Sequence, residues 1–325
     1  MRARTIVALA LLVSILALAA TVLAAPPRPA TFSIVAADSV AGEVGVAVAS
    51  RFFAVGSVVP YARAGVGAVA TQANANGTWG PRGLDLLAQG VLPDETLRVL
   101  IRTDDAGHND RQAGIVTAGG RSATHTGAGC NSWAGGRSGP GYAVQGNILV
   151  GERVVAAMEA SFVASKGKRL AERLLAALKA GDAEGGDSRG RQSAAILVCR
   201  EHGGFNGYSD RAIDIRVDDS PDPFGEISRL LGMALVNDEW NQAWTAFTQQ
   251  RLPEALKLQE SAAGRAEAQP AMLPEVLYDL AVIRLANGDR TRAEAALARA
   301  IRLNPKLAAQ AEKDTDLAPL RAKPK

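Results

Sequence analysis

The stretch Thr31-Phe-Ser-Ile-Val-Ala-Ala37 decides the fold, because its apolar and β-branched residues predict the first core strand of the folded protein. A hydroxyl residue, Thr31, opens this strand. At the very start of a mature chain, a free α-amine can accept the proton of its own residue's hydroxyl, so no separate histidine base is needed. Thr31 is therefore a candidate nucleophile. The alternative is an ordinary threonine at the edge of a strand.

A hydrophobic leader precedes this strand. Arg2 and Arg4 form a short basic segment, residues 6–25 carry no charge, and small residues gather at the end. This pattern is typical of a secretory signal peptide over residues 1–25. A stretch of this length also just spans a bilayer, so an uncleaved membrane anchor is the alternative. Both alternatives place the body of the protein outside the cytoplasm, either secreted or periplasmic.

A proline-rich spacer, residues 26–30, separates the leader from Thr31. Cleavage of the leader alone leaves Thr31 in mid-chain, without the free amine that activates its hydroxyl. Arg28, three residues before Thr31, does not fit the small-x-small pattern of a signal peptidase site. A second cleavage is therefore required before Thr31 can act as an N-terminal nucleophile.

Two regions of different character follow the spacer. Residues 31–225 alternate between short strands and helices, and residues 226–325 are helical. The expected strands are residues 32–37, 45–50, 66–70, 112–117, 142–148, 194–199 and 213–217. The expected helices of the first region are residues 83–89, 93–103 and 154–180, the last one ending at Gly181. This order predicts an α+β fold in which two layers of sheet are sandwiched between helices.

The polar, proline-rich residues 218–223 mark the boundary between the two regions. Beyond it, residues 226–249 predict an amphipathic helix and residues 273–303 a helix pair. The pair resembles a tetratricopeptide repeat at its packing positions, which are Leu277, Leu280, Ala281, Ala293, Leu297, Ala300 and Pro305. One such unit rarely stands alone, so this tail is expected to pack on the main domain or on a second copy. It serves either as a partner-binding surface or as a stabilising cap.

The composition of the chain and the motifs it lacks exclude several functions. Loss of Arg2 and Arg4 lowers the formal net charge from +3 to +1, which gives no electrostatic case for nucleic-acid binding. The three histidines are isolated, and neither a phosphate loop nor a dinucleotide motif occurs, so we expect no metal and no cofactor. A membrane partner is expected only if the leader stays uncleaved. Cys130 and Cys199 form either a disulfide or two buried thiols.

Polar side chains recur where predicted strands end. Gln72, Asn74 and Asn76 follow one buried strand, and side-chain amides can donate hydrogen bonds to an oxyanion. We therefore assign Asn74 and Asn76 to catalysis with Thr31. The residues assigned to substrate binding are Arg51, Gln72, Gln145, Asn147, Arg191 and Gln192. Each of them taken alone also fits the ordinary preferences of loops and turns.

Several blocks of sequence resemble a known family. The blocks are residues 31–36, 48–60, 65–73, 142–149, 190–195 and 208–219. They are similar to a bacterial family, the domain of unknown function 1028, which is grouped with the Ntn (N-terminal nucleophile) hydrolases. The resemblance covers about residues 31–232. It implies a four-layer α-β-β-α fold and amide-bond hydrolysis, with Thr31 at the position where many members open with Met-Thr or Met-Ser. The leader and spacer depart from that pattern.

Together these observations predict an exported Ntn-type amidohydrolase. Thr31 Oγ attacks an amide carbonyl, and Asn74, Asn76 or backbone N–H groups stabilise the oxyanion. Arg51 binds a carboxylate of a small amide or peptide substrate. The alternative is a non-catalytic scaffold that binds a peptide or protein partner, or a second copy, through residues 226–325.

Overall fold

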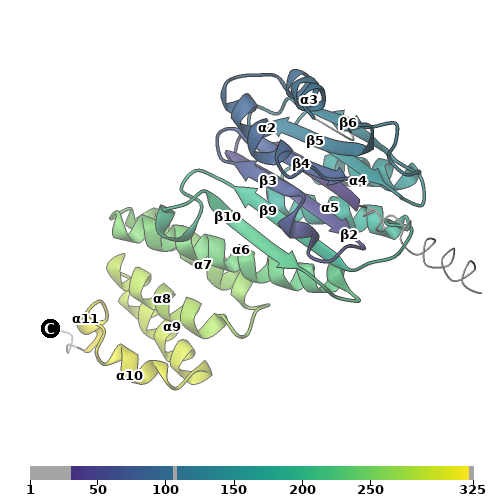
Figure 1. Cartoon of the computed structure of the whole chain (residues 1–325). Coiled ribbons are helices and arrows are strands. Elements are labelled where there is room, and N and C mark those ends of the chain that lie inside the picture. Colours follow the sequence, from purple (N-terminus) through teal and green to yellow (C-terminus); the bar gives the residue numbers. More distant parts are fainter. Residues whose placement is uncertain (1–30, 105–107, 322–325) are drawn as a thin grey trace, which may run out of the picture.

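The computed structural model describes residues 31–104 and 108–321, and the predicted leader and spacer lie outside them. Two antiparallel sheets face each other (Figure 1). Sheet A has six strands in the order β10-β9-β2-β1-β8-β7, and sheet B has four in the order β3-β4-β5-β6. The strands are β1 (Thr31–Asp38), β2 (Glu43–Ser50), β3 (Pro60–Arg63), β4 (Gly67–Ala73), β5 (Arg111–Thr117), β6 (Ser122–Thr126), β7 (Gly135–Gly139), β8 (Tyr142–Asn147), β9 (Ser193–Cys199) and β10 (Arg211–Val217).

Strand β1 lies in the middle of sheet A, between β2 and β8, and is buried on both faces. Its side chains alternate with the period of two expected of a strand. Phe32 and Ile34 pack against helices, whereas Val35 packs between the two sheets. Thr31 and Ser33 share the face of Val35, so both hydroxyls lie between the sheets.

Helices cover the outer face of each sheet. Apolar side chains of α2 and α3 pack with those of β4 and β5 on sheet B. Side chains of α4 and α5 pack on sheet A. These helices are α2 (Trp79–Ala88), α3 (Pro93–Arg102), α4 (Arg153–Ala164) and α5 (Leu170–Ala183). The predicted combination of helices and sheets is confirmed, and the sheets are antiparallel.

The single helix predicted over residues 154–180 is wrong, because α4 and α5 are separate helices joined by residues 165–169. Gly167 in that link has φ of +91°, a conformation that breaks a helix and favours glycine. Gly181 is not the helix end either. It lies inside α5, where an added Cβ would come within 2.7 Å of Met158 Cγ, so the glycine lets α4 approach α5 closely.

The C-terminal region is helical, as predicted. Its helices are α6 (Pro223–Thr248), α7 (Leu252–Ala266), α8 (Leu273–Ala286), α9 (Arg290–Leu303), α10 (Leu307–Ala311) and α11 (Ala318–Arg321). The first half of α6 supplies Phe224, Ile227 and Leu231 to the core of sheet A. Its second half, from Val236 onward, packs with α7 and α8. In Figure 1 the helices α6 and α7 lie between the sheets and the last four helices, α8 to α11.

A cluster of ion pairs, the ionic cluster, joins the sandwich to α6 and α7. Its members are Glu43, Arg169, Glu172, Arg200, Asp238, Glu239 and Arg265. Asp238 lies at its centre, has a fully buried side chain, and pairs with Arg169 and with Arg200. Glu239 accepts from Arg169 and from Arg265. Charged pairs therefore cross from sheet and α5 to α6 and α7.

The predicted strands correspond to β1, β2, β4, β5, β8, β9 and β10, whereas β3, β6 and β7 were not predicted. These three strands are only four or five residues long and lie at or beside sheet edges. Within residues 31–104 and 108–321, no helix has both the length and the apolar character needed to cross a membrane.

Candidate functional site

One end of the space between the two sheets is filled by uncharged polar side chains, which we call the amide cluster. Its members are Thr31, Ser33, Ser50, Gln72, Gln112, Gln145 and Asn147, each at most 3% exposed. They come from β1, β2, β4, β5 and β8. The opposite end of the same space is apolar, with Val35, Val46 and Val116 among its members. The interface between the two sheets therefore has a polar half and an apolar half.

The amide cluster holds the backbone of Thr31 in place. Its carbonyl oxygen accepts from Gln72 Nε2 at 3.2 Å and from Asn147 Nδ2 at 3.5 Å. Both amides also donate to Gln112 Oε1, each at 2.9 Å. Gln112 Nε2 in turn donates to the Gly146 carbonyl at 2.7 Å. Because each buried group has partners, the orientation of the first residue of β1 is fixed from both sheets.

Ser33 connects the cluster to Gln145. Ser33 Oγ donates to Gln72 Oε1 and accepts from Gln145 Nε2, both at 2.6 Å. Gly114 of β5 lies opposite, where an added Cβ would come within 2.1 Å of Gln145 Oε1. Glycine is therefore required at this position of the facing sheet to leave room for the glutamine amide.

The Thr31 hydroxyl lies where the amide cluster meets a cavity. Thr31 Oγ1 donates to Ser50 Oγ at 3.2 Å. The cavity, which we call the Thr31 cavity, has a volume of about 200 Å³. It is lined by Thr31, Phe52, Val55, Val58, Val59, Gln72, Ala73, Asn74 and Ala75. None of these lining residues is charged, and most are apolar, so the cavity favours an uncharged apolar group.

The two asparagines assigned to catalysis differ in position. Asn74 lines the Thr31 cavity and is exposed. Asn76 is not among the lining residues, and its side chain is used within the turn that precedes α2. Its Oδ1 accepts from the Thr78 N–H at 3.0 Å and from the Thr78 hydroxyl at 2.7 Å, and its Nδ2 donates to Asp104 Oδ2 at 3.3 Å. Asn76 therefore shapes a turn, and of the two asparagines only Asn74 lines the Thr31 cavity.

Two of the predicted substrate ligands, Gln145 and Asn147, join Gln72 in the amide cluster, where they hold protein groups. Arg51 is not brought to the Thr31 cavity. Its Nη1 donates to the Arg189 carbonyl at 2.6 Å, and its backbone N–H donates to Asp187 Oδ2 at 2.7 Å.

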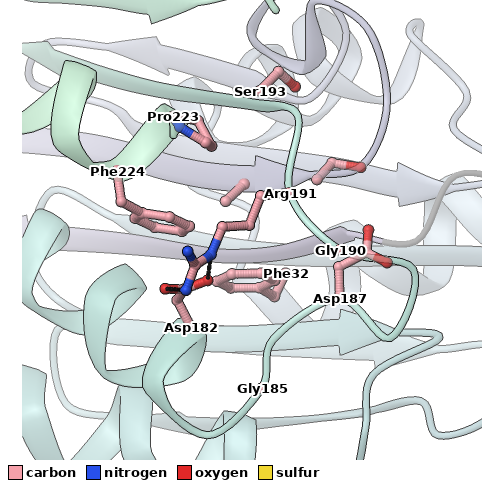
Figure 2. Close-up of a pocket in the computed structure, with 11 residues that line it drawn as sticks. Phe32, Asp182, Gly185, Asp187, Gly190, Arg191, Ser193, Pro223 and Phe224 are labelled. Carbon is pink, nitrogen blue, oxygen red and sulfur yellow. Dashed lines mark hydrogen bonds and ion pairs between the residues drawn. The ribbon is translucent and has the colours of Figure 1, made fainter. Parts of the chain in front are cut away.

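Arg191 and Gln192 likewise lie away from Thr31. Figure 2 shows Arg191 beside Phe32 and Phe224, with its guanidinium directed at Asp182. Arg191 and Asp182 form a bidentate ion pair, with N–O distances of 2.7 and 2.8 Å. They line a smaller cavity of about 110 Å³ on the face of β1 that carries Phe32. Gln192 Nε2 donates to Asp219 Oδ1, in the loop after β10, at 3.0 Å.

Three members of the amide cluster were not predicted from the sequence: Ser33, Ser50 and Gln112. The signal for Ser33 was its spacing, because a polar residue two positions after Thr31 shares its face of the strand. Ser50 and Gln112 stand at the end of β2 and near the start of β5, and only the pairing of the sheets brings them beside Thr31.

Other reactive side chains lie outside this site. Cys130 and Cys199 are not joined in a disulfide, and burial raises the pKa of Cys199 to about 12. Burial lowers the pKa of His125. Across the described part of the chain, no group of three or more His, Cys, Asp or Glu side chains is arranged to hold a metal ion.

Comparison with known proteins identifies the family. The model of a family of unknown function, DUF1028, matches residues 31–227. The chain belongs to the DUF1028 family. A similar DUF1028 structure is the crystal structure of protein SPO2555 from Silicibacter pomeroyi, at 30% sequence identity and a TM-score of 0.57, covering 63% of this chain and 89% of that one. No curated protein matches. The family predicted from sequence is confirmed, and the match ends near the start of α6.

Proposed function

We propose that this DUF1028 protein is an exported amidohydrolase with Thr31 as its N-terminal nucleophile. One observation carries the proposal: the hydroxyl of the first residue of β1 lies between the rigid amide cluster and the uncharged Thr31 cavity. The two facing sheets, with helices outside both, resemble the four-layer arrangement of Ntn hydrolases. The secretory pattern of residues 1–25 supports export.

The reaction begins after cleavage between Ala30 and Thr31. The freed α-amine takes the hydroxyl proton while Thr31 Oγ1 attacks the amide carbonyl carbon. Asn74 Nδ2 donates to the oxyanion of the tetrahedral intermediate. The C–N bond then breaks, the leaving amine takes the proton, and an ester remains on Thr31. Water, deprotonated by the same α-amine, hydrolyses that ester and restores the hydroxyl.

The lining of the Thr31 cavity indicates the substrate class. Phe52, Val58 and Val59 offer apolar surface, and no lining residue offers a counter-charge. We therefore propose a small amide or peptide with an apolar group next to the scissile carbonyl. Burying such a group is favourable by about 25 cal/mol per Å² of apolar surface.

Variants of Thr31 test the mechanism. Thr31→Ala should abolish hydrolysis of 4-nitroanilides with short apolar acyl groups, whereas Thr31→Ser should retain part of it, because serine keeps the hydroxyl and the amine. Intact-mass analysis of protein from its native host must show a chain that begins at residue 31. A chain that begins near residue 26, or full turnover by Thr31→Ala, excludes this mechanism.

The two asparagines provide a matched pair. Asn74→Ala should lower kcat by about 10²–10³-fold, the range for loss of one oxyanion donor. Asn76→Ala removes the same amide outside the cavity and should leave kcat near that of the parent. Equal effects of the two variants on kcat would contradict the oxyanion role of Asn74.

We also propose that the helical region is a repeat-like platform that binds a second copy of the chain. The support is that six of the seven positions predicted from tetratricopeptide packing are buried or half-buried in α8 and α9, including Leu277, Leu280 and Ala293, whereas Pro305, beyond the end of α9, is exposed. Leu303, at the end of α9, is 48% exposed. Sedimentation equilibrium should show a dimer that Leu303→Glu dissociates, and a monomer at all concentrations would exclude the self-association.

A further inference from the structure

A second and larger hollow lies at the opposite end of β1 from Thr31. The eight residues of β1 separate the two by roughly 25 Å, at about 3.3 Å per residue. The groove has a volume of about 750 Å³. It is formed where the β1–β2, β5–β6 and β7–β8 turns meet α4 and α5, and it is lined by Ala37, Asp38, Ser39, Val40, Ala41, Gly119, Gly120, Pro140, Gly141, Tyr142, Phe162, Val163, Lys166, Gly167 and Arg173.

Arg173 is the distinctive side chain of this groove. Its guanidinium lies 3.9 Å from the centroid of the Phe162 ring, and Nη2 donates to the Phe162 carbonyl at 3.4 Å. Its Nε is buried without a hydrogen-bond partner, and none of the ion pairs formed by the described residues includes Arg173. Burial lowers the pKa of Arg173, and Asp38 only partly opposes that effect. The cation is therefore partly desolvated, and Asp38 balances its charge only in part.

The remaining groups of the groove favour an anion with an apolar body. Lys166 adds a second cation that pairs with no described carboxylate. Asp38 is the one acid among the lining residues, and its Oδ1 accepts from the backbone N–H groups of Val40 and Ala41 at 3.1 and 3.0 Å. Val163, 54% exposed, provides apolar surface next to these charges.

We propose that this groove binds an organic carboxylate that carries an apolar chain. The carboxylate pairs with the Arg173 guanidinium, whose planar shape suits a carboxylate better than the point charge of a lysine does. The apolar chain lies along Tyr142, Phe162 and Val163. Both a free fatty acid and the C-terminus of an apolar peptide have this chemistry. The site is separate from the Thr31 cavity, so binding is expected to persist in Thr31→Ala.

Calorimetric titration of the full chain tests the site with defined probes. Octanoate represents the free acid, and acetyl-Ala-Leu-Leu with a free C-terminus represents the peptide. Octanamide and the amidated peptide are the neutral controls. We expect one saturable site for octanoate or for the free-acid peptide, with each neutral control at least about tenfold weaker because the charged hydrogen bonds are lost. The probe that binds more tightly identifies the source of the carboxylate.

Variants assign the binding to the groove. Arg173→Gln should weaken binding of the tighter probe at least about tenfold. The control is Arg153→Gln, the same change at an exposed residue that begins α4, at the end of the helix away from the groove, and it should leave binding unchanged. Val163→Asp places a negative charge at an exposed position of the groove and should also abolish binding, which keeps the test decisive if Arg173→Gln fails to fold.

Several results would overturn the proposal. Among them are the absence of saturable binding by either acid, equal binding of acid and amide, and binding that both Arg173→Gln and Val163→Asp retain. Binding of inorganic phosphate alone would also exclude it, because the groove would then recognise a bare anion.

Discussion

The amide cluster and the ionic cluster solve the same problem, the burial of polar groups, in opposite ways. The amide cluster holds two sheets together with hydroxyls and amides that carry no charge. The ionic cluster holds the helical region on the sandwich with charged pairs around the fully buried side chain of Asp238. Neutral amides lose less hydration on burial than ions do. The comparison predicts that the sandwich interior is insensitive to pH near neutrality, whereas the junction with the helices depends on charge.

The largest effect is expected at the centre of the ionic cluster. Asp238→Ala leaves Arg169 and Arg200 without their shared buried partner, and it should lower the free energy of unfolding by about 3–5 kcal/mol. The control is Asp85→Ala, which breaks an exposed pair with Arg63 and should cost about 0–1 kcal/mol. Urea unfolding of both variants measures the difference. Equal losses would show that the junction does not depend on burial of the charge.

A somewhat smaller effect is expected at the centre of the amide cluster. Gln112→Leu keeps similar volume but leaves the amides of Gln72 and Asn147 without their shared acceptor, so we expect a loss of about 2–4 kcal/mol. Val116→Ala, on the same face of β5 at the apolar end, removes only two methyl groups and should cost about 1.5 kcal/mol.

The pH dependence of the stability lost in Gln112→Leu tests whether the amide cluster is uncharged. The loss in Gln112→Leu should be the same at pH 6 and pH 8 in urea unfolding, because no member of the amide cluster titrates in that range. A loss that changed between these pH values would contradict the neutral character assigned to the cluster.

The helical region, unlike the amide cluster, contains a buried carboxylate that titrates, Asp279. Asp279 Oδ2 accepts from the indole N–H groups of Trp240 and Trp244 at 2.7 and 2.6 Å, and burial raises the pKa of Asp279 to about 6. The folded state then holds the proton more tightly than the unfolded state. Protonated Asp279 therefore stabilises the folded state, and this stabilisation is complete below about pH 4. As the pH rises to 6 the stabilisation is lost, which lowers the free energy of unfolding by about 2–3 kcal/mol at 1.36 kcal/mol per pKa unit.

Unfolding by urea between pH 4 and pH 7 measures this decrease. Asp279→Asn should remove it, because the amide cannot ionise, whereas the exposed Asp316→Asn should leave the profile of the parent. A pH profile that is identical in the parent and in Asp279→Asn contradicts the raised pKa.

The smallest of the four effects is expected at the boundary between the polar and apolar halves of the sandwich. Gly114→Ala places a methyl group within 2.1 Å of Gln145 Oε1, so the amide must move away from Ser33. We expect a loss of about 1–3 kcal/mol, the range for overpacking. Gly151→Ala is the control, since nothing lies within 4 Å of its added Cβ. A neutral Gly114→Ala would show that Gln145 is free to move.

Much of the fold could be predicted because apolar, β-branched runs such as residues 32–37 and 194–199 specify buried strands locally. Strands β3, β6 and β7 could not, because short edge strands have little apolar pattern and are fixed by their neighbours. The break between α4 and α5 was hidden by helix-forming residues on both sides. Gly167 marked the break, whereas Gly181 was taken for a helix end although its reason is close packing against Met158.

The candidate site could be predicted only in part. Thr31, Gln72, Gln145 and Asn147 were chosen as polar residues in or after apolar strands, and the fold brings them together. Arg51 was chosen by the same reasoning, yet it lies elsewhere. Position at a strand end does not say which face or which neighbour a side chain meets, and that information comes from the register of distant strands.

Helix α6 has a consequence for the way this chain can be divided. Because Ile227, Leu231 and Leu235 belong to the core of the sandwich, a cut at residue 225 would remove part of that core. The natural graft point lies one turn beyond Leu235, inside the helix. Any exchange of C-terminal modules, by evolution or by an engineer, must therefore join helix to helix in phase, since one inserted residue would turn the new module by about 100°.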